Sequence, residues 1–600
     1  MLVLVLLAAL IILWRAFGFV RGMVAFGICV VGLTEGLSAF HAVRMWPLFA
    51  GWLGVCAAAL AVRPRGGEWP HWAAWAAIAP IAGIVLFVAL KSVPNSTDVM
   101  AYHLPRVLFW AQNGSVAFFP THYYNQIMLQ PMAEYTVLQT WVLSESDRYA
   151  NLVQFLGFFG SAAVVSLIAR EMGATARGQV MAALICATLP NGILQASGAK
   201  NDAYLALWLA AMVYFALRFD WWWMSAALAL ALFTKGTAYL FAPAFLVGAL
   251  GPVAWRERGR LVRALPAIVV CVAAINGPLY WRNYSLSGSI LGFDSALGDA
   301  TYRWKNEPLS VAAMTSNALR HFSEGAGMRS EAWNRGLYNA VLRVHRALGI
   351  DPNDRRTTWQ DGQFGPPVNA NHETNANNRW HLLLFALSGV ALMFWRKWDW
   401  LCFFGSVVVA YLLFCGYLKW QPFMTRMLLP LFVMAAVVSG LVLDKLEWTW
   451  LQVLVCLFLL NNTRPYLLEN WTRPLKGPRS ILKIAREDGY FADMTVYGNK
   501  NEYIEAVRRT LESGCERVGI DDKTFPLEYP YEALLRAANP RIRFEHVGVT
   551  NASARYRVGG EPDVCVVLCL GCGDGPEQRA KFVGVGEPVV IGRSLLFVRK

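Results

Sequence analysis

Apolar segments of the length that crosses a lipid bilayer recur along most of this sequence. The first begins at residue 2 and the last ends at residue 460. A helix rises about 1.5 Å per residue, so roughly 20 apolar residues span the hydrocarbon core. Hydrophobic residues make up 56% of the chain and charged residues only 16%, which excludes an ordinary soluble domain. The sequence therefore predicts a polytopic α-helical membrane protein.

The positions of basic residues predict how the segments are oriented. We expect about 13 transmembrane helices within residues 1–475. Basic residues cluster in alternate connections, at Arg63, Arg170, Arg258 and Arg396. Positive connections are typically cytoplasmic, so the long loops 91–148 and 282–379 are predicted on the outer face. We expect short amphipathic helices in the first of these loops, lying on the membrane surface. Residues 2–13 resemble the core of a signal peptide but lack a typical cleavage site, so we expect them to be retained.

The last part of the chain, residues 476–600, changes in character. Short β-like runs at 517–520, 541–547, 563–568 and 595–598 alternate with helix-like patches at 501–511 and 530–537. This alternation predicts a small α/β domain, on the outer face by the helix count. It contains Cys515, Cys565, Cys569 and Cys572, which could form disulfides outside the cytoplasm. The CxxC pair has no second pair or histidine at zinc spacing.

Isolated cations stand at the predicted outer ends of several helices. They are Lys200, Lys235, Arg282, Lys419 and Arg426. Positive charge on this face opposes the topology rule and needs a local reason. Each residue alone could reach a lipid headgroup or form an ion pair. As a group, they favour a site that binds the phosphate of a lipid-linked substrate. The net charge of +14 comes with no nucleic-acid-binding motif, so we expect no nucleic acid partner.

Three acids lie on the same predicted face. Asp98 follows the apolar run 72–90, Glu134 lies in the same loop, and Asp202 begins a later helix. Asp98 could cap a helix, because it follows a polar stretch at residues 95–97. Sugar transfer from a lipid phosphate needs a base for the acceptor proton and cations for the departing phosphate. We interpret Asp98 as that base, with Asp202 and Glu134 as further candidate catalytic acids.

Histidines in the outer loops raise the question of a metal. His103, His122, His372 and His381 could join Asp98 or Glu134 around a divalent ion. No pair has the tight spacing of metal ligands, so we expect hydrogen-bonded or stacked histidines. A divalent metal stays possible, and no cofactor is required.

Several short motifs resemble those of a known family. They are Asp98 with Tyr102-His103-Leu104-Pro105-Arg106, Trp110 and Asn113-Gly114-Ser115; Ala199-Lys200-Asn201-Asp202; Thr234-Lys235-Gly236-Thr237; Pro278-Leu279-Tyr280-Trp281-Arg282-Asn283; and Arg426-Met427-Leu428-Leu429-Pro430. Their order and placement resemble the bacterial polyprenyl-phosphate-dependent glycosyltransferases of the GT-C fold. This family includes protein O-mannosyltransferases and the lipid A aminoarabinose transferase. The resemblance spans most of residues 72–443.

This resemblance implies an inverting sugar transfer at the periplasmic face of a bacterial inner membrane. The donor would be a polyprenyl-phosphate-linked sugar, with Asp98 as base and Asp202 as a second functional acid. Lys235, Arg282 and Arg426 would bind the phosphate. The other predicted substrate-binding residues are His103, Lys200, Asn283 and Lys419. Protein mannosyltransferases carry an Asp-Glu pair in the first loop, whereas Val99 follows Asp98 here. A protein acceptor is therefore not carried over, and the acceptor is left open among glycan, lipid and protein.

Two other functions are compatible with a many-helix membrane protein. A lipid or sugar transporter would need ionisable residues near the bilayer midplane and repeat symmetry. The apolar segments are nearly free of interior charge and show no inverted repeat. A polysaccharide ligase or polymerase would use a lipid diphosphate donor and the second large loop. That reading predicts that Arg320, His321 and Arg379 matter more than Asp98.

Overall fold

The computed structural model describes residues 2–64, 66–254, 256–292, 304–360, 362–368, 370–493, 500–522 and 527–599. The predicted outer loop 282–379 and the predicted tail domain 476–600 each include residues outside these ranges.

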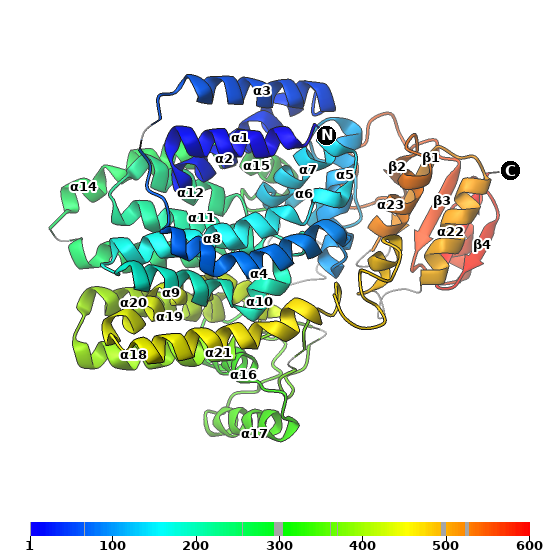
Figure 1. Ribbon diagram of the computed structural model, residues 1–600. Coiled ribbons are helices and arrows are strands. Elements are labelled where there is room, and N and C mark those ends of the chain that lie inside the picture. The colour runs from blue at the N-terminus through cyan, green and yellow to red at the C-terminus, as the bar shows by residue number, and fades with distance from the viewer. Residues whose placement is uncertain are drawn as a thin grey trace.

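Most of the chain is a bundle of helices that run side by side (Figure 1). In the first half they are α1 (Leu4–Phe17), α2 (Phe19–Ser38), α3 (Met45–Ala61), α4 (Trp72–Lys91), α8 (Leu152–Glu171), α9 (Ala176–Ala187), α10 (Pro190–Gln195) and α11 (Asp202–Leu217). In the second half they are α12 (Trp221–Leu232), α13 (Ala238–Leu250), α14 (Arg258–Val262), α15 (Ala264–Ser287), α18 (Arg379–Trp395), α19 (Trp398–Tyr417), α20 (Leu429–Leu446) and α21 (Thr449–Leu468). A turn at residues 233–237 separates α12 from α13.

Many of these helices are suited to a bilayer. Within the described residues, 7 helices are long and apolar enough to cross a membrane, and further apolar helices of 10–17 residues accompany them. The predicted helical, apolar architecture is therefore present. The number of spans stays a prediction, because the shorter helices do not reach the full length on their own.

The bundle has a buried centre and an apolar rim. In the most apolar stretch of Met424–Leu446, which holds α20, 89% is buried inside the protein. In that of Arg258–Ser287, which holds α15, only 22% is buried. On α15, Val269 and Leu265 stay 66% and 59% exposed. Such apolar exposure along a long helix suits contact with lipid tails rather than water.

Close packing at the centre fixes the start of α11. A Cβ atom at Gly157 of α8 would lie only 2.6 Å from the backbone nitrogen of Tyr204. Gln154, one turn earlier on α8, accepts hydrogen bonds from the backbone N–H groups of Ala203 and Tyr204. The first turn of α11, and with it Asp202, is therefore held against α8.

The first outer loop contains short helices, as predicted. They are the π-helix η1 (Val99–His103), α5 (Leu104–Asn113), α6 (Asn125–Met128), α7 (Met132–Ser144) and the short η2 (Asp147–Tyr149). The expectation that they lie on the membrane surface is wrong for α7, which is buried from Met132 to Leu143. It packs against α2, α3 and α5, so both of its faces are covered.

The tail forms the predicted α/β domain. Its strands are β1 (Arg517–Asp522), β2 (Arg543–His546), β3 (Val566–Leu570), β4 (Pro588–Ile591) and β5 (Ser594–Val598), in the order β2-β1-β3-β5-β4. β1 pairs in parallel with β2 and β3, whereas β5 is antiparallel to β3 and β4. Three helices accompany the sheet in the described residues: α22 (Lys500–Glu512), α23 (Tyr529–Ala538) and the short α24 (Pro576–Ala580). β4 was not predicted from the sequence, because the strand has only 4 residues and most of them are partly exposed.

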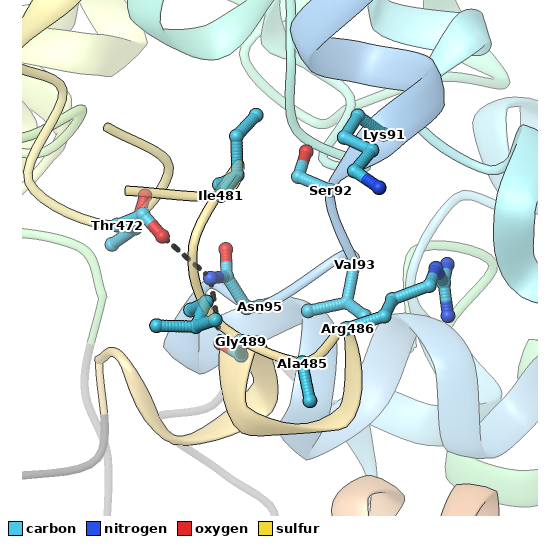
Figure 2. Close-up of a pocket in the computed structure, with 10 residues that line it drawn as sticks. Lys91, Ser92, Val93, Asn95, Thr472, Ile481, Ala485, Arg486 and Gly489 are labelled. Carbon is cyan, nitrogen blue, oxygen red and sulfur yellow. Dashed lines mark hydrogen bonds between the residues drawn. The ribbon is translucent and has the colours of Figure 1, made fainter. Parts of the chain in front are cut away.

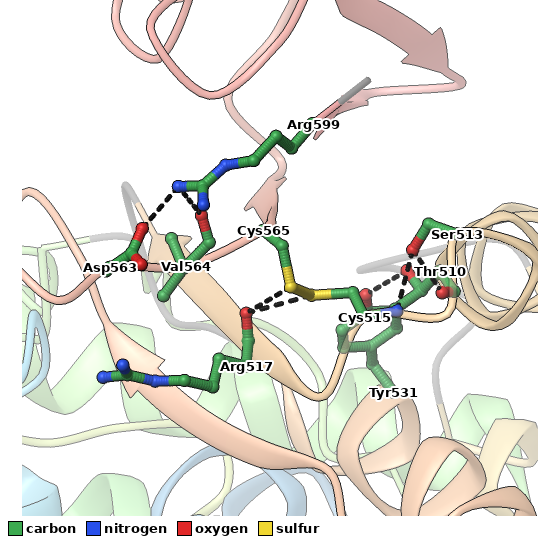
Figure 3. The surroundings of a disulfide bond; sticks show 9 residues. All are labelled: Thr510, Ser513, Cys515, Arg517, Tyr531, Asp563, Val564, Cys565 and Arg599. Carbon is green, nitrogen blue, oxygen red and sulfur yellow. Dashed lines mark hydrogen bonds and ion pairs between the residues drawn. A yellow bond between two sulfur atoms is a disulfide. The ribbon is translucent and has the colours of Figure 1, made fainter.

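Disulfides join the tail cysteines. Cys515, after α22, is bonded to Cys565, just before β3, and Arg599 pairs nearby with Asp563 (Figure 3). A second disulfide joins Cys569 and Cys572. The cysteines in the apolar segments are free thiols.

The tail domain docks on the first outer loop, at one end of the bundle (Figure 1). Gln112 of α5 exchanges two hydrogen bonds with the backbone of Phe544. Asp147 of η2 accepts from Arg486, Tyr490 and Tyr529. The basic α14 lies at the opposite end of the bundle from this domain (Figure 1).

Candidate active site

Hydrogen bonds of Asn95 and Thr97 fix the chain just before it reaches Asp98. Asn95 is buried and donates from its amide to the carbonyls of Thr472 and Gly489 (Figure 2). Thr97 donates from its backbone and its hydroxyl to Asp493. The segment that follows α4 therefore lies in a fixed position between the bundle and the residues that lead to the tail domain.

Asp98 does not cap the helix that follows it. Its backbone is already helical, and its side chain makes no capping hydrogen bond to η1. The carboxylate instead forms an ion pair with Arg426 at 2.5 Å. Arg426 lies in the 3-10 turn η4 (Met424–Leu428) that precedes α20. The chain thus joins an acid and a cation that are far apart in the sequence.

The surroundings of Asp98 favour its charged form. Burial works against ionisation, but the charges of Arg426, Lys200 and His103 outweigh it. Together they hold the pKa of the Asp98 carboxyl well below its usual range. The side chains of Asp98 and Arg426 keep 18% and 12% of their surface exposed, so the pair is reachable from outside.

Asp202 and Lys235 form a second pair beside the first. Lys235, in the turn between α12 and α13, lies 2.5 Å from a carboxylate oxygen of Asp202. The other oxygen of Asp202 is buried and has no hydrogen-bond partner. Burial lowers the pKa of the Lys235 ammonium, and Arg426 acts in the same direction, while Asp202 opposes them. The charges of Asp98 and Arg426 both act on Lys235, so the two pairs share one site.

Lys200 takes part in a third, buried network. Its ammonium lies 2.7 Å from Glu373, which also pairs with Arg473 at 2.6 Å. Burial alone would raise the pKa of Glu373, but Lys200 and Arg473 hold it well below its usual range. This network leaves Lys200 close enough for its charge to act on Asp98.

Glu134 lies behind the site. His103 donates from Nδ1 to Glu134 at 2.8 Å, and Arg106 donates to the same oxygen at 3.1 Å. All three side chains are buried. Burial opposes the charge of Glu134, but Arg106 and His103 lower its pKa. Glu134 therefore fixes the position of His103, and it is itself buried rather than open to a substrate.

Arg282 points to a different acid. It donates two hydrogen bonds to Glu35 of α2, at 2.9 and 2.6 Å, and one to the hydroxyl of Tyr135. Tyr135 in turn donates to Glu35. The hydrogen bonds of Arg282 are therefore to α2 and α7 and not to the Asp98–Arg426 pair.

Two more residues of the predicted substrate-binding set are engaged elsewhere. Asn283 is buried and donates to the carbonyls of Met128 and Ile290. Lys419 pairs with Glu307 and donates to the carbonyl of Arg355. The structure places both in contacts that stabilise the outer loops.

The histidines proposed as metal ligands are dispersed. His122 faces Asp521, His372 pairs with Asp493, and His381 lies against Thr188. Within the described part of the chain, the groups of three potential ligands all lie in the tail domain. Asp98 and Glu134 are not among them.

Three important partners, Glu373, Glu35 and Arg473, were not anticipated from the sequence. Glu373 lies in a polar loop that contains many acids and asparagines, so no local pattern distinguishes it from its neighbours. Glu35 had a clearer signal, since it is an acid inside an apolar segment, and such residues usually face a partner. Arg473 follows the last apolar segment and looked like a surface residue, yet it is fully buried.

No family model matches this sequence, and no curated protein matches it. Among solved structures, the chain is similar to two crystal structures of ArnT from Cupriavidus metallidurans, one bound to undecaprenyl phosphate and one in the apo state. Identity is 13% in both cases, with TM-scores of 0.49 and 0.48. The matches cover 87% of this chain and 97% and 96% of the two others.

These neighbours are from the family that the sequence motifs resemble. The similarity is too distant in identity and in superposition to support an argument about activity, so a function for this chain has to rest on the geometry around Asp98.

Proposed function

We propose that this protein is an integral-membrane glycosyltransferase that moves a sugar from a polyprenyl-phosphate donor to an acceptor, with inversion at the sugar. The observation that supports it is the ion pair between Asp98 and Arg426 at 2.5 Å, beside the pair of Asp202 and Lys235. The donor class is the one implied by the family resemblance of the motifs around these residues. We place the reaction at the periplasmic face of a bacterial inner membrane.

The chemistry follows from one base and several cations. An acceptor hydroxyl attacks the anomeric carbon of the sugar while Asp98 takes its proton. The bond between that carbon and the phosphate oxygen breaks, and its electron pair stays on the phosphate. Arg426, Lys235 and Lys200 can stabilise the charge that develops there. Asp202 then holds Lys235 in place rather than reacting itself.

Donor binding should strengthen the base. In the structure Arg426 neutralises Asp98, which makes the carboxylate a weak base. A lipid phosphate that engages Arg426 and Lys235 would weaken their hold on Asp98 and add negative charge nearby. Both effects raise the pKa of Asp98. The base would therefore become effective only when the donor is in place.

The ligase reading finds less support. Arg320 is buried, and its guanidinium donates to Thr358 and to the carbonyl of Thr357. Burial lowers the pKa of Arg320 to about 10. Arg379 donates to the carbonyl of Gly327. These contacts suit residues that hold the second outer loop together rather than residues that bind a diphosphate.

The transporter reading is weakened by where the charges lie. Asp98, Asp202, Lys235 and Arg426 all stand at the ends of helices or in the turns between them. A transport pathway would need ionisable groups near the middle of the bundle. The acceptor stays open among glycan, lipid and protein hydroxyls.

A donor-binding and transfer assay tests the proposal. The full chain in nanodiscs is titrated with undecaprenyl phosphate, and transfer is followed as the release of lipid phosphate from a panel of undecaprenyl-phosphate sugars. We expect Asp98→Asn to keep lipid binding and to lose transfer by roughly 10²–10⁴-fold. Arg426→Ala and Lys235→Ala should weaken lipid binding. The control Lys91→Ala removes an exposed cation at the outer end of α4 and should change neither.

Two results would contradict this function. One is normal transfer by Asp98→Asn. The other is undecaprenyl phosphate binding that is as tight in Arg426→Ala and Lys235→Ala as in the unmodified protein.

A further inference from the structure

A second cluster of chemically active side chains lies in the tail domain, away from Asp98. Asp522 ends β1, His546 ends β2, and Glu528 immediately precedes α23. The carboxyl ends of parallel strands meet at one edge of a sheet, where α/β domains often bind ligands. One ligand atom from each of these three residues lies within 4.8 Å of the others.

The cluster is deeply buried, and its acids outnumber its one basic partner, His546, which faces Glu528. Asp522, Glu528 and His546 are 5%, 0% and 3% exposed. Both carboxylate oxygens of Asp522 are buried without a hydrogen-bond partner, and so are both oxygens of the neighbouring Glu532. Buried carboxylates are costly unless a cation or a proton compensates them. The nearby acid Asp521 has its own cation, Lys581, at 2.7 Å.

The histidine is held in the orientation of a metal ligand. His546 Nδ1 lies 3.0 Å from the carbonyl oxygen of Pro120, which can only accept, so Nδ1 carries the proton. His546 Nε2 then faces Glu528 at 2.9 Å. Metal-bound histidines usually donate their second nitrogen to a carbonyl or carboxylate in this way. Two ligand atoms at about 2.1 Å from one ion and at right angles are about 3 Å apart, close to this separation.

We propose that Asp522, Glu528 and His546 bind a divalent transition-metal cation. Carboxylate oxygens with one imidazole suit Mn²⁺ or Zn²⁺ better than Ca²⁺ or Mg²⁺, which take oxygen ligands alone. This site is distinct from the metal that the sequence suggested for the outer-loop histidines around Asp98.

The cation would fasten the tail domain to the first outer loop. His546 bonds to Pro120 and stacks on Phe109 at 4.5 Å. Gln126 donates from one amide nitrogen to Glu528 and to the carbonyl of Ala101, which lies in η1. A ligand of the cation is thus two hydrogen bonds away from the helix that Asp98 begins.

Protons bound to the buried carboxylates are the alternative to a metal ion in this cluster. Burial, with the charges of Glu528 and Asp521, raises the pKa of Asp522 well above its usual range. Burial, Glu528 and Asp522 do the same to the pKa of Glu532. Acids that are neutral at physiological pH need no cation, so the experiment must separate a bound metal from bound protons.

Metal binding by the intact chain decides between them. The protein is stripped with EDTA, kept free of reductant so that the Cys569–Cys572 disulfide supplies no thiolate, and dialysed against Mn²⁺ or Zn²⁺. We expect one ion per chain by elemental analysis. Mn²⁺ should show the magnetic coupling of one histidine nitrogen by pulsed electron paramagnetic resonance. Asp522→Asn should weaken binding by at least about tenfold, and His546→Gln should remove the nitrogen signal.

The matched control for these variants is a substitution of Glu545. Glu545→Gln changes the neighbouring, partly exposed acid on the other face of β2 and should leave binding and the nitrogen signal intact. Near-ultraviolet circular dichroism of each variant shows whether the domain is folded. The proposal is overturned if the folded, unmodified chain retains no ion at micromolar Mn²⁺ or Zn²⁺. It is equally overturned if the ion retained shows no histidine nitrogen, or if Asp522→Asn binds as tightly.

Discussion

The Asp98 carboxylate is surrounded by cations that belong to other elements. Arg426 contacts it, and Lys200 and His103 act from further away. Their combined effect exceeds the cost of burial, so the pKa of Asp98 lies well below its usual range. A residue so placed is ionised at every physiological pH. Its strength as a base then depends on whether these cations also bind a phosphate.

The pH dependence of transfer should reveal this coupling. The profile of kcat/KM reports the free protein, where the pKa of Asp98 is depressed, so Asp98 should produce no acid limb down to about pH 4. The profile of kcat reports the donor-bound state, where the phosphate occupies the cations. Its acid limb should therefore lie at higher pH. Identical limbs in both profiles would contradict the coupling of Asp98 to the phosphate-binding cations.

Glu373 provides a prediction about stability. The Gln variant leaves Lys200 and Arg473 without a charged partner, and breaking a buried pair of this kind costs about 3–5 kcal/mol. Because the folded pKa of Glu373 is depressed, its contribution is present above the unfolded value of about 4.3 and is lost as the pH falls. Thermal unfolding of Glu373→Gln should be clearly below that of the unmodified protein at pH 7, with the gap narrowing below about pH 4. A gap that is constant over this range would show that the charge of Glu373 is not the cause.

At the scale of helices, the contact between α8 and α11 positions Asp202. Gly157 lets the backbones approach, and Gln154 accepts from the first two N–H groups that follow Asp202. The Asp202–Lys235 pair depends on this contact, because α11 begins at Asp202. A change in helix packing should therefore reach the site without touching any charged residue.

Gly157→Leu tests that link. Its side chain would meet the backbone of Tyr204, and overpacking of this kind costs about 1–3 kcal/mol. We expect a lower unfolding temperature and weaker binding of undecaprenyl phosphate. Gly83→Leu is the matched control, because a Cβ at this position on α4 meets nothing within 4 Å. If both variants bind lipid phosphate as the unmodified protein does, the α8–α11 contact does not position the site.

The elements were easier to predict than their contacts. Apolar length and basic turns indicated most helices, and alternation of short runs indicated the tail sheet. The burial of α7 was missed because it depends on neighbours from α2, α3 and α5, which no local pattern reveals. Long-range ion pairs such as Glu35 with Arg282 were missed for the same reason. The motif residues Asp98, Lys235 and Arg426 were predicted because their placement at helix ends was visible in the sequence.

At the scale of the whole molecule, the tail domain covers the loop that carries Asp98. Asp147 is central to this contact, because it accepts from Arg486 at 2.8 Å and from the hydroxyls of Tyr490 and Tyr529. The bundle and the tail domain are therefore expected to behave as one unit around the site.

Asp147→Ala should loosen that unit. The variant leaves Arg486 and two buried hydroxyls without their acceptor, and each hydrogen bond to a charged group is worth about 1.5–3 kcal/mol. Hydrogen exchange should increase in η1, α5 and the segment around Tyr529, while α8 and α20 keep their protection. Asp399→Ala, on the side of the bundle where α19 begins, is the control and should leave these regions unchanged. Unchanged exchange in η1 and α5 on loss of Asp147 would show that the tail domain does not support the loop.

The most direct test of the central claim is a cryo-electron microscopy map of the full chain in nanodiscs with undecaprenyl phosphate. We expect phosphate density within hydrogen-bond distance of both Arg426 and Lys235, with the Asp98 carboxylate facing the same cavity. Phosphate density at another part of the molecule, or against Arg320 and Arg379 in the second outer loop, would contradict it.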